Sequence, residues 1–177
     1  MELSTLSDTE LLTRIREDDA DALEVLLGRH YKLVHGVAFR LSGSSSDAQD
    51  ITQDVLVRAA RSIRSFQGKS KFSTWLYRIA TNAAYDFGKR KGREARLKQA
   101  ATEDYELNKV VGNNEDLSKT IQAALVKLSD KEREAVVLTF YEGLTHAEVA
   151  QILGCAETTV SWRVFTAKRK LKHLLKF

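Results

Sequence analysis

The chain has 177 residues, 43% of them hydrophobic and 29% charged, which is the composition of a globular protein with one ordinary domain or two small ones. Its single cysteine excludes a disulfide framework and a cysteine-ligated zinc site, and no apolar run is long enough to span a bilayer. The first ten residues are polar and acidic, unlike a secretory signal, so we expect a cytoplasmic protein with no direct membrane insertion.

Charge is segregated along the chain in alternating blocks. Residues 1–50 and residues 101–150 each carry 5 basic and 10 acidic side chains, whereas residues 51–100 carry 12 basic against 3 acidic, and residues 151–177 carry 6 against 1. Two basic surfaces of this kind suit two contacts with a polyanion such as nucleic acid. Solvated basic helix faces explain the pattern equally well, so charge alone leaves both interpretations open.

Helix signals predict four helices in the N-terminal half, and the absence of proline favours long ones. The expected helix starts are Ser7 (a capping box with Glu10), Asp19 or Asp21, Ser46 (a capping box with Gln49) and a position near Ser73. The second helix shows an apolar stripe in steps of three and four that stops at Gly43, formed by Leu23, Leu27, Tyr31, Val34, Ala38 and Leu41.

Residues 88–116 lack a sustained apolar stripe, and their last part predicts a polar linker. Helical periodicity then returns with Leu117, Ile121, Ala124, Leu125 and Leu128. Two further capping boxes follow, Ser129 with Glu132 and Thr145 with Glu148. With no alternating strand pattern, the sequence predicts an all-α fold: two small helical domains joined by a polar linker, the second with about four shorter helices.

The sharpest local pattern is THAEVAQILGCAETTVSWRVFTAK, residues 145–168. A helix ending at Gly154, a three-residue turn and a second helix with Val160, Val164 and Ala167 turned inward predict a helix-turn-helix, whose second helix enters the DNA major groove. A helical hairpin with a basic exterior is the alternative. The side chains expected to face DNA are hydroxyls, cations and one tryptophan: Thr158, Thr159, Ser161, Trp162, Arg163, Thr166, Lys168, Arg169 and Lys170.

Two upstream motifs resemble a known family. The string DAQDITQDV at residues 47–55, followed by FQGKSKFSTWLYRIATN at residues 66–82, resembles region 2 of bacterial sigma factors of the extracytoplasmic-function (ECF, group IV) type in the sigma-70 family. LSDKERE at residues 128–134, with the helix-turn-helix after it, resembles their region 4. The resemblance implies region 2 over residues 1–94, a linker over 95–117 and region 4 over 118–177.

The resemblance also implies partners and site residues. The first motif would dock on the clamp helices of the largest subunit of core RNA polymerase, through Asp47, Asp50, Gln53 and Asp54 on one helix face. The second would open the −10 promoter element and hold an unstacked base, with polar and charged groups that suit exposed single-stranded DNA: Gln67, Lys69, Ser70, Lys71, Arg78, Asn82, Asp86, Lys89 and Arg90. Trp75 is expected in the core rather than against a base.

The helix-turn-helix would read the −35 element, with Arg163 contributing most. Relatives often carry arginine where Ser161 and Thr166 stand here, so base preferences do not transfer. Cys155, in the turn, is expected to be a partly buried apolar side chain, with a redox role as the alternative.

No catalytic motif, cofactor-binding loop or metal-ligand spacing stands out, so we expect no enzyme, no cofactor and no metal. Two other hypotheses remain: a stand-alone helix-turn-helix regulator and a sigma-like decoy that only sequesters an anti-sigma protein. Because few residues follow region 4, the resemblance implies control by a separate anti-sigma factor, which would hold the protein at the membrane if the factor is itself anchored there.

Overall fold

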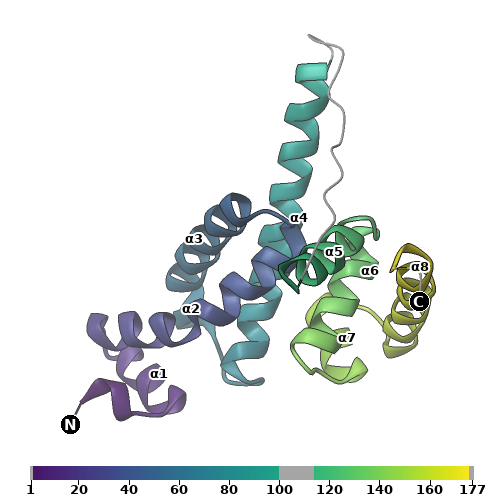
Figure 1. The fold of residues 1–177 in the computed structure, drawn as a ribbon. Helices are drawn as coiled ribbons and strands as arrows, with labels where there is room; N and C mark the ends of the chain where they lie inside the picture. The colour runs from purple at the N-terminus through teal and green to yellow at the C-terminus, as the bar shows by residue number, and fades with distance from the viewer. Residues whose placement is uncertain (1, 100–113, 176–177) are drawn as a thin grey trace.

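The structure is a computed structural model that describes residues 2–99 and 114–175, with side chains described for 2–93 and 117–175. Every regular element in these ranges is helical, as Figure 1 shows, which confirms the all-α prediction. Residues 100–113, the central part of the predicted linker, lie outside the described residues. Its two ends are helical, because residues 95–99 close α4 and residues 114–117 open α5.

The N-terminal half packs its helices around α2. Its elements in chain order are η1 (Leu3–Thr5), α1 (Asp8–Arg16), α2 (Ala20–Ser42), α3 (Ser45–Ser62), η2 (Ile63–Ser65) and α4 (Phe72–Gln99). α2 contacts α1, α3 and α4, and α3 also packs against α4. The second half of α4 projects away from this bundle (Figure 1).

The helix starts follow from side-chain caps. The capping box of Ser7 with Glu10 and the N-cap at Asp19 are present as predicted. The predicted start at Ser46 is wrong, because Gly43 ends α2 in the left-handed conformation and leaves Ser44 extended. The Ser44 hydroxyl therefore accepts the backbone N–H of Asp47 and caps α3 two residues earlier than expected.

Part of the predicted apolar stripe of α2 is displaced. Tyr31 is 42% exposed, and Leu26 is buried where the sequence indicated Leu27. α1 and η1 pack against α2, and Ala22 and Leu26 are fully buried in its first half. The later part of the stripe, Val34, Ala38 and Leu41, is buried as predicted.

The C-terminal half contains α5 (Asn114–Val126), α6 (Asp130–Val136), a π-helical segment η3 (Val137–Tyr141), α7 (His146–Leu153) and α8 (Glu157–Leu175). The capping boxes at Ser129 and Thr145 are both present. The predicted stripe of α5 begins too early, because Leu117 is 53% exposed while Ala124, Leu125 and Leu128 are buried.

The two halves pack against each other. One cluster of buried apolar side chains extends from α1–α4 into α6, α7 and α8. α4 contacts α7, and α2 contacts α5, α6 and η3. A smaller cluster of Leu125, Leu128, Val136 and Ala167 lies within the C-terminal half. The sequence predicted the two domains but contained no signal for this interface.

Candidate nucleic-acid interface and docking surface

The acidic face of α3 lies beside basic residues of α4. Ile51 and Val55 are buried, so the helix turns Asp50 and Gln53 to the exterior, with Asp47 and Asp54 half-buried at the two ends of the face. A shallow depression joins these four residues to Phe87, Arg90 and Lys91. The four predicted docking residues therefore share one surface.

Two ion pairs flank this acidic face. Lys91 Nζ lies 2.5 Å from an Asp47 carboxylate oxygen, and Arg58 lies 2.8 Å from Asp54. Arg58 also donates a 3.0 Å hydrogen bond to Asp86, and these carboxylate partners raise the pKa of its guanidinium. Among the described residues no such pair is formed by Asp50, so its carboxylate is the one best placed to meet a basic partner.

The segment between α3 and α4 is an exposed polar loop fixed at both ends by aromatic side chains. Gln67, Gly68, Lys69, Ser70 and Lys71 are all exposed. Phe66 and Phe72 are buried on either side of the loop, with ring centroids 5.6 Å apart, and Trp75 packs against both at 5.4 Å. Gly68 adopts a left-handed φ of 72°, which a side chain would strain. Trp75 thus supports the loop from the core, as predicted.

The face of α4 predicted to contact the −10 element meets the second domain. Arg78 and Asn82 are both exposed and lie one turn apart on α4. The guanidinium of Arg78 donates a hydrogen bond to the backbone carbonyl of Gln151 in α7. Farther along α4, Lys89 lies over the ring of Tyr85 at 5.1 Å and Arg90 over that of Phe87 at 5.7 Å. Asn82 is thus exposed while Arg78 is engaged with α7.

A polar contact next to Arg78 ties the domains together. The hydroxyl of Tyr77 donates a 2.8 Å hydrogen bond to the Glu142 carboxylate, which Arg40 of α2 approaches to 3.3 Å. Burial and the neighbouring Glu142 charge both raise the pKa of Tyr77 well above its ordinary value. Gln122 of α5 adds hydrogen bonds to the carbonyls of Phe39 and Arg40.

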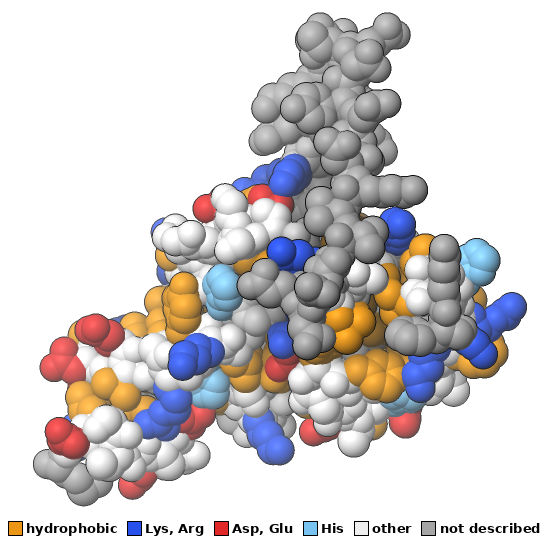
Figure 2. Space-filling view, in the orientation of Figure 1, with side chains coloured by type: hydrophobic (Ala, Val, Ile, Leu, Met, Phe, Trp, Pro, Cys, Tyr) orange, Lys and Arg blue, Asp and Glu red, His pale blue; other side chains and the backbone are white. Residues whose placement is uncertain are grey.

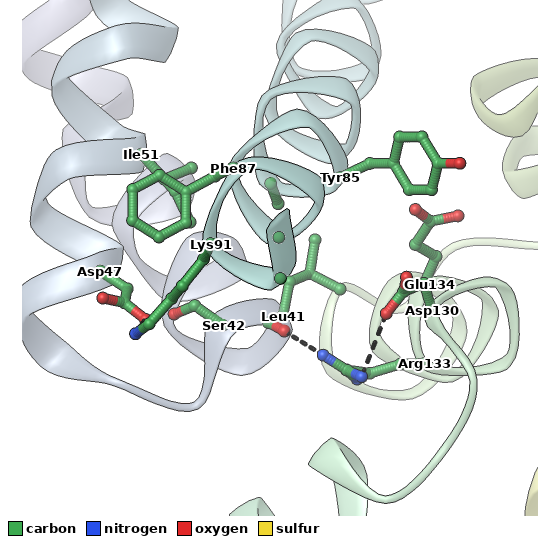
Figure 3. A pocket seen from close by; sticks show the side chains of 13 residues that line it. Leu41, Ser42, Asp47, Ile51, Tyr85, Phe87, Lys91, Asp130, Arg133 and Glu134 are labelled. Carbon is green, nitrogen blue, oxygen red and sulfur yellow. Dashed lines mark hydrogen bonds and ion pairs between the residues drawn. The ribbon is translucent and has the colours of Figure 1, made fainter. Parts of the chain in front are cut away.

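A cavity of about 330 Å³ opens between α2, α3, α4 and α6 (Figure 3). The side chains of Tyr85 and Glu134 lie on the same side of this cavity, and Lys91 and Asp47 lie across from them (Figure 3). Burial and, to a smaller extent, the charge of Asp130 raise the pKa of Glu134 to about 7, although the nearby positive charges act in the opposite direction. This carboxyl is a titratable group at the domain boundary that the sequence did not reveal.

The helix-turn-helix forms as predicted. Thr145 caps α7, Gly154 ends it with a left-handed φ of 62°, and α8 buries Val160, Val164 and Ala167. Of the predicted DNA-facing residues, Thr158, Ser161, Trp162, Lys168 and Arg169 are exposed, and Thr159, Arg163 and Thr166 are partly buried on one flank of α8. Arg163 donates to the sulfur of the partly buried Cys155 at 3.7 Å, so it does not project freely outward.

One exposed residue of α8 was missed from the sequence. Phe165 is 60% exposed beside Trp162, which is 64% exposed. On the side of the molecule formed by the C-terminal half, Lys and Arg side chains lie among exposed hydrophobic ones (Figure 2). The sequence did contain a signal for this exposure, because a residue three positions after Trp162 lies on the same helix face as Trp162.

The described part of the chain contains no group of three or more His, Cys, Asp or Glu side chains placed to hold a metal ion, and none of its helices is long and apolar enough to cross a membrane. An exposed polar loop and a basic helix-turn-helix on one all-helical chain are the features of a DNA-binding transcription protein.

Comparison with known proteins specifies that class. Residues 26–94 match the family Sigma-70 region 2, and residues 118–171 match Sigma-70, region 4. The chain is 33% identical to the ECF RNA polymerase sigma-E factor of Haemophilus influenzae, with 95% of both chains covered. It is 32% identical to the ECF RNA polymerase sigma factor SigW of Bacillus subtilis, with 93% of this chain and 95% of SigW covered.

Solved structures are similar over both halves. RpoE, in complex with the anti-sigma factor NepR from Bartonella quintana, has a TM-score of 0.70 and 29% identity, covering 85% of this chain and 94% of its own. CnrH, in complex with the cytosolic domain of CnrY, has a TM-score of 0.70 and 28% identity, covering 96% and 97%. The chain belongs to the ECF sigma factors of the sigma-70 family. It is a non-enzymatic RNA polymerase sigma factor that directs transcription initiation.

Proposed function

We propose that this sigma factor acts through three separate surfaces. The domains that carry them span residues 1–94 and 118–177, and residues 95–117 form the linker. The acidic face of α3, formed by Asp47, Asp50, Gln53 and Asp54, docks on the clamp helices of core RNA polymerase. The loop before α4 and Asn82 capture a base of the opened −10 element, and α8 contacts the −35 element. The exposure of Asp50 and Gln53 above the buried Ile51 and Val55 supports the docking role most directly.

The −10 role is supported by how the loop is held. Its five residues project from a fixed aromatic base of Phe66, Phe72 and Trp75, so their amide, hydroxyl and ammonium groups are available without distorting the core. Single-strand capture needs cations for the phosphates and polar groups for the base edges, and the loop offers both. Asp86, Lys89 and Arg90 continue along α4, where the two cations suit flanking phosphates.

We further propose that the protein acts in the cytoplasm and is held inactive by a separate anti-sigma factor. The similar RpoE was solved with an anti-sigma factor and CnrH with a cytosolic domain of another protein. A protein wrapped between α4 and the helix-turn-helix would cover surfaces that we assign to DNA. Reconstitution of the chain with a co-purified binding protein, followed by transcription assays, tests this part of the proposal.

The experiment that tests the main proposal is reconstitution of the full chain with core RNA polymerase. We expect a stable holoenzyme that starts transcription from promoter fragments which core polymerase alone does not use. A stand-alone helix-turn-helix regulator would bind DNA without joining core polymerase. A decoy would bind an anti-sigma factor yet support no transcription, so the three functions give different results.

A further inference from the structure

The most exposed face of α8 is aromatic rather than polar. Thr158, Trp162, Phe165 and Arg169 follow one another in steps of four, three and four, so they form one stripe opposite the buried side of the helix. Trp162 is 64% exposed and Phe165 is 60% exposed. Two large exposed aromatic side chains on the second helix of a helix-turn-helix indicate a binding surface.

Three of the polar side chains that the sequence placed on the DNA-facing side are engaged within the protein. Arg163 donates to Cys155 from a partly buried position, and Lys170 forms an ion pair of 2.8 Å with the buried Glu132. Ser161 donates its hydroxyl hydrogen to the Glu157 carbonyl at 3.1 Å, and its oxygen lies 2.8 Å from His146 Nδ1. On the outer stripe, the hydrogen-bonding side chains are thus Thr158 and Arg169, which lie on either side of the two aromatic residues.

The charges next to the aromatic pair favour DNA as the partner. The Arg169 guanidinium lies 5.8 Å from the Phe165 ring, and Lys168 lies 4.7 Å from the ring of Phe140 on the neighbouring η3 segment. An apolar surface flanked by cations is complementary to a DNA groove, because phosphates line both sides of the base edges there. In the major groove, thymine is the base that presents an apolar group, its C5-methyl.

We propose that Trp162 and Phe165 determine promoter specificity by packing against the C5-methyl groups of thymines in the −35 element. The inference deepens the proposed function of α8 and rests on it. The side chains lie one helical turn apart, so each would contact a different base step. Arg169, stacked beside Phe165, would neutralise a flanking phosphate rather than read a base.

Replacing thymine by deoxyuridine, which removes only the methyl group, tests the inference. The full chain with core polymerase first selects its preferred −35 sequences from a randomised promoter library. Each selected thymine is then changed to deoxyuridine, and holoenzyme binding is measured. We expect about fourfold weaker binding at two positions, the effect of losing one buried carbon of this size at each. Trp162→Ala and Phe165→Ala should each abolish the deoxyuridine effect at one of them.

Tyr31→Ala, which removes an exposed aromatic side chain of α2, is the matched control and should leave the deoxyuridine effect unchanged. Circular dichroism checks folding of each variant. Equal binding of thymine and deoxyuridine promoters, or an undiminished deoxyuridine effect in Trp162→Ala, overturns the inference while leaving the proposed function standing. Weaker binding of Trp162→Ala to core polymerase with an unchanged deoxyuridine effect would make the pair a protein contact and also overturn it. A library that yields no −35 preference defeats the proposed −35 role of α8 itself.

Discussion

Tyr77 of α4 donates its hydroxyl hydrogen to Glu142, which follows η3, and this bond joins the helix assigned to the −10 element with the domain assigned to the −35 element. Arg40 approaches the same carboxylate, and its guanidinium lies 4.6 Å from the Tyr141 ring. Because Arg78, the next residue of α4, donates to Gln151, the −10 face of α4 and α7 are held together in the free chain. The Arg78 side chain must give up this hydrogen bond before it can contact DNA as we propose.

The first prediction concerns this contact. Tyr77→Phe keeps the buried ring but removes the hydrogen bond to a charged group, which should weaken domain docking by about 1.5–3 kcal/mol. Single-molecule energy transfer between dyes on the two domains should then show a larger population with separated domains. Tyr31→Phe, a hydroxyl deletion at an exposed position of α2, is the control. An unchanged distribution in Tyr77→Phe would mean that apolar packing alone holds the domains.

The second prediction concerns polymerase docking. Asp50→Lys reverses the exposed charge at the centre of the acidic face of α3 and should weaken binding to core polymerase about tenfold. Glu24→Lys makes the same charge change at an exposed position of α2 and should leave that affinity unchanged. Both variants should keep wild-type helicity, since exposed substitutions usually alter stability little. Equal affinities for the two variants would remove the α3 face from the docking site.

The third prediction concerns strand opening. Replacing Lys69, Ser70 and Asn82 together with alanine should spare core binding and closed-promoter binding, because these side chains are exposed and lie outside the α3 face. The variant should fail to capture an unstacked base. Unstacking one base step costs on the order of a few kcal/mol, and the altered side chains no longer offset this cost. Permanganate reactivity of unpaired thymines around the −10 element reports the loss. Normal reactivity would show that the base is captured elsewhere, with the exposed Arg78 as the next residue to test.

The fourth prediction follows from Glu134. Burial raises its pKa to about 7 in the folded chain from an ordinary value of 4.5, so the folded state retains a proton that the unfolded chain releases. The contribution of the protonated Glu134 to the free energy of unfolding is fully present below pH 4.5 and is lost as the pH rises through about 7. Asp130, Lys131, Arg133 and Arg163 are the charged groups that act on this carboxyl.

Glu134→Gln keeps the shape of the side chain but removes this pH dependence. The thermal midpoint of Glu134→Gln minus that of the wild type should therefore be larger near pH 8 than near pH 5. We expect this difference to grow by at least about 3 °C between the two pH values, which corresponds to about 1 kcal/mol for a chain of this size. Differences that are equal at the two pH values would show that Glu134 is ionised in the folded protein throughout that range.

Local chemistry accounts for what the sequence predicted well. Capping boxes at Ser7, Ser129 and Thr145, and the left-handed turn at Gly154, depend on residues only three or four apart, so they are visible in the sequence. The cap at Ser44 was misplaced because three consecutive serines offer competing hydroxyls, and the left-handed Gly43 decides between them.

Long-range packing accounts for what the sequence did not show. The contacts of Arg78 with Gln151 and of Arg163 with Cys155 depend on where whole helices meet, which periodicity does not specify. The exposure of Phe165 is a related case, because an aromatic residue near a hydrophobic stripe is normally assigned to the core. The resemblance to a family located the predicted binding surfaces, whereas the structure shows which side chains on them are exposed and which are engaged within the protein.

The uninterrupted length of α4 has a mechanical consequence. Its 28 residues form a rod of about 42 Å at 1.5 Å per residue, with the proposed −10 loop before its first residue and the predicted linker after its last. Such a rod acts as a lever. A tilt of roughly 10° at the loop would carry the far end about 7 Å sideways, by the geometry of a rod of that length. A small rotation that seats the loop on a base would therefore also shift the tether of the −35 domain.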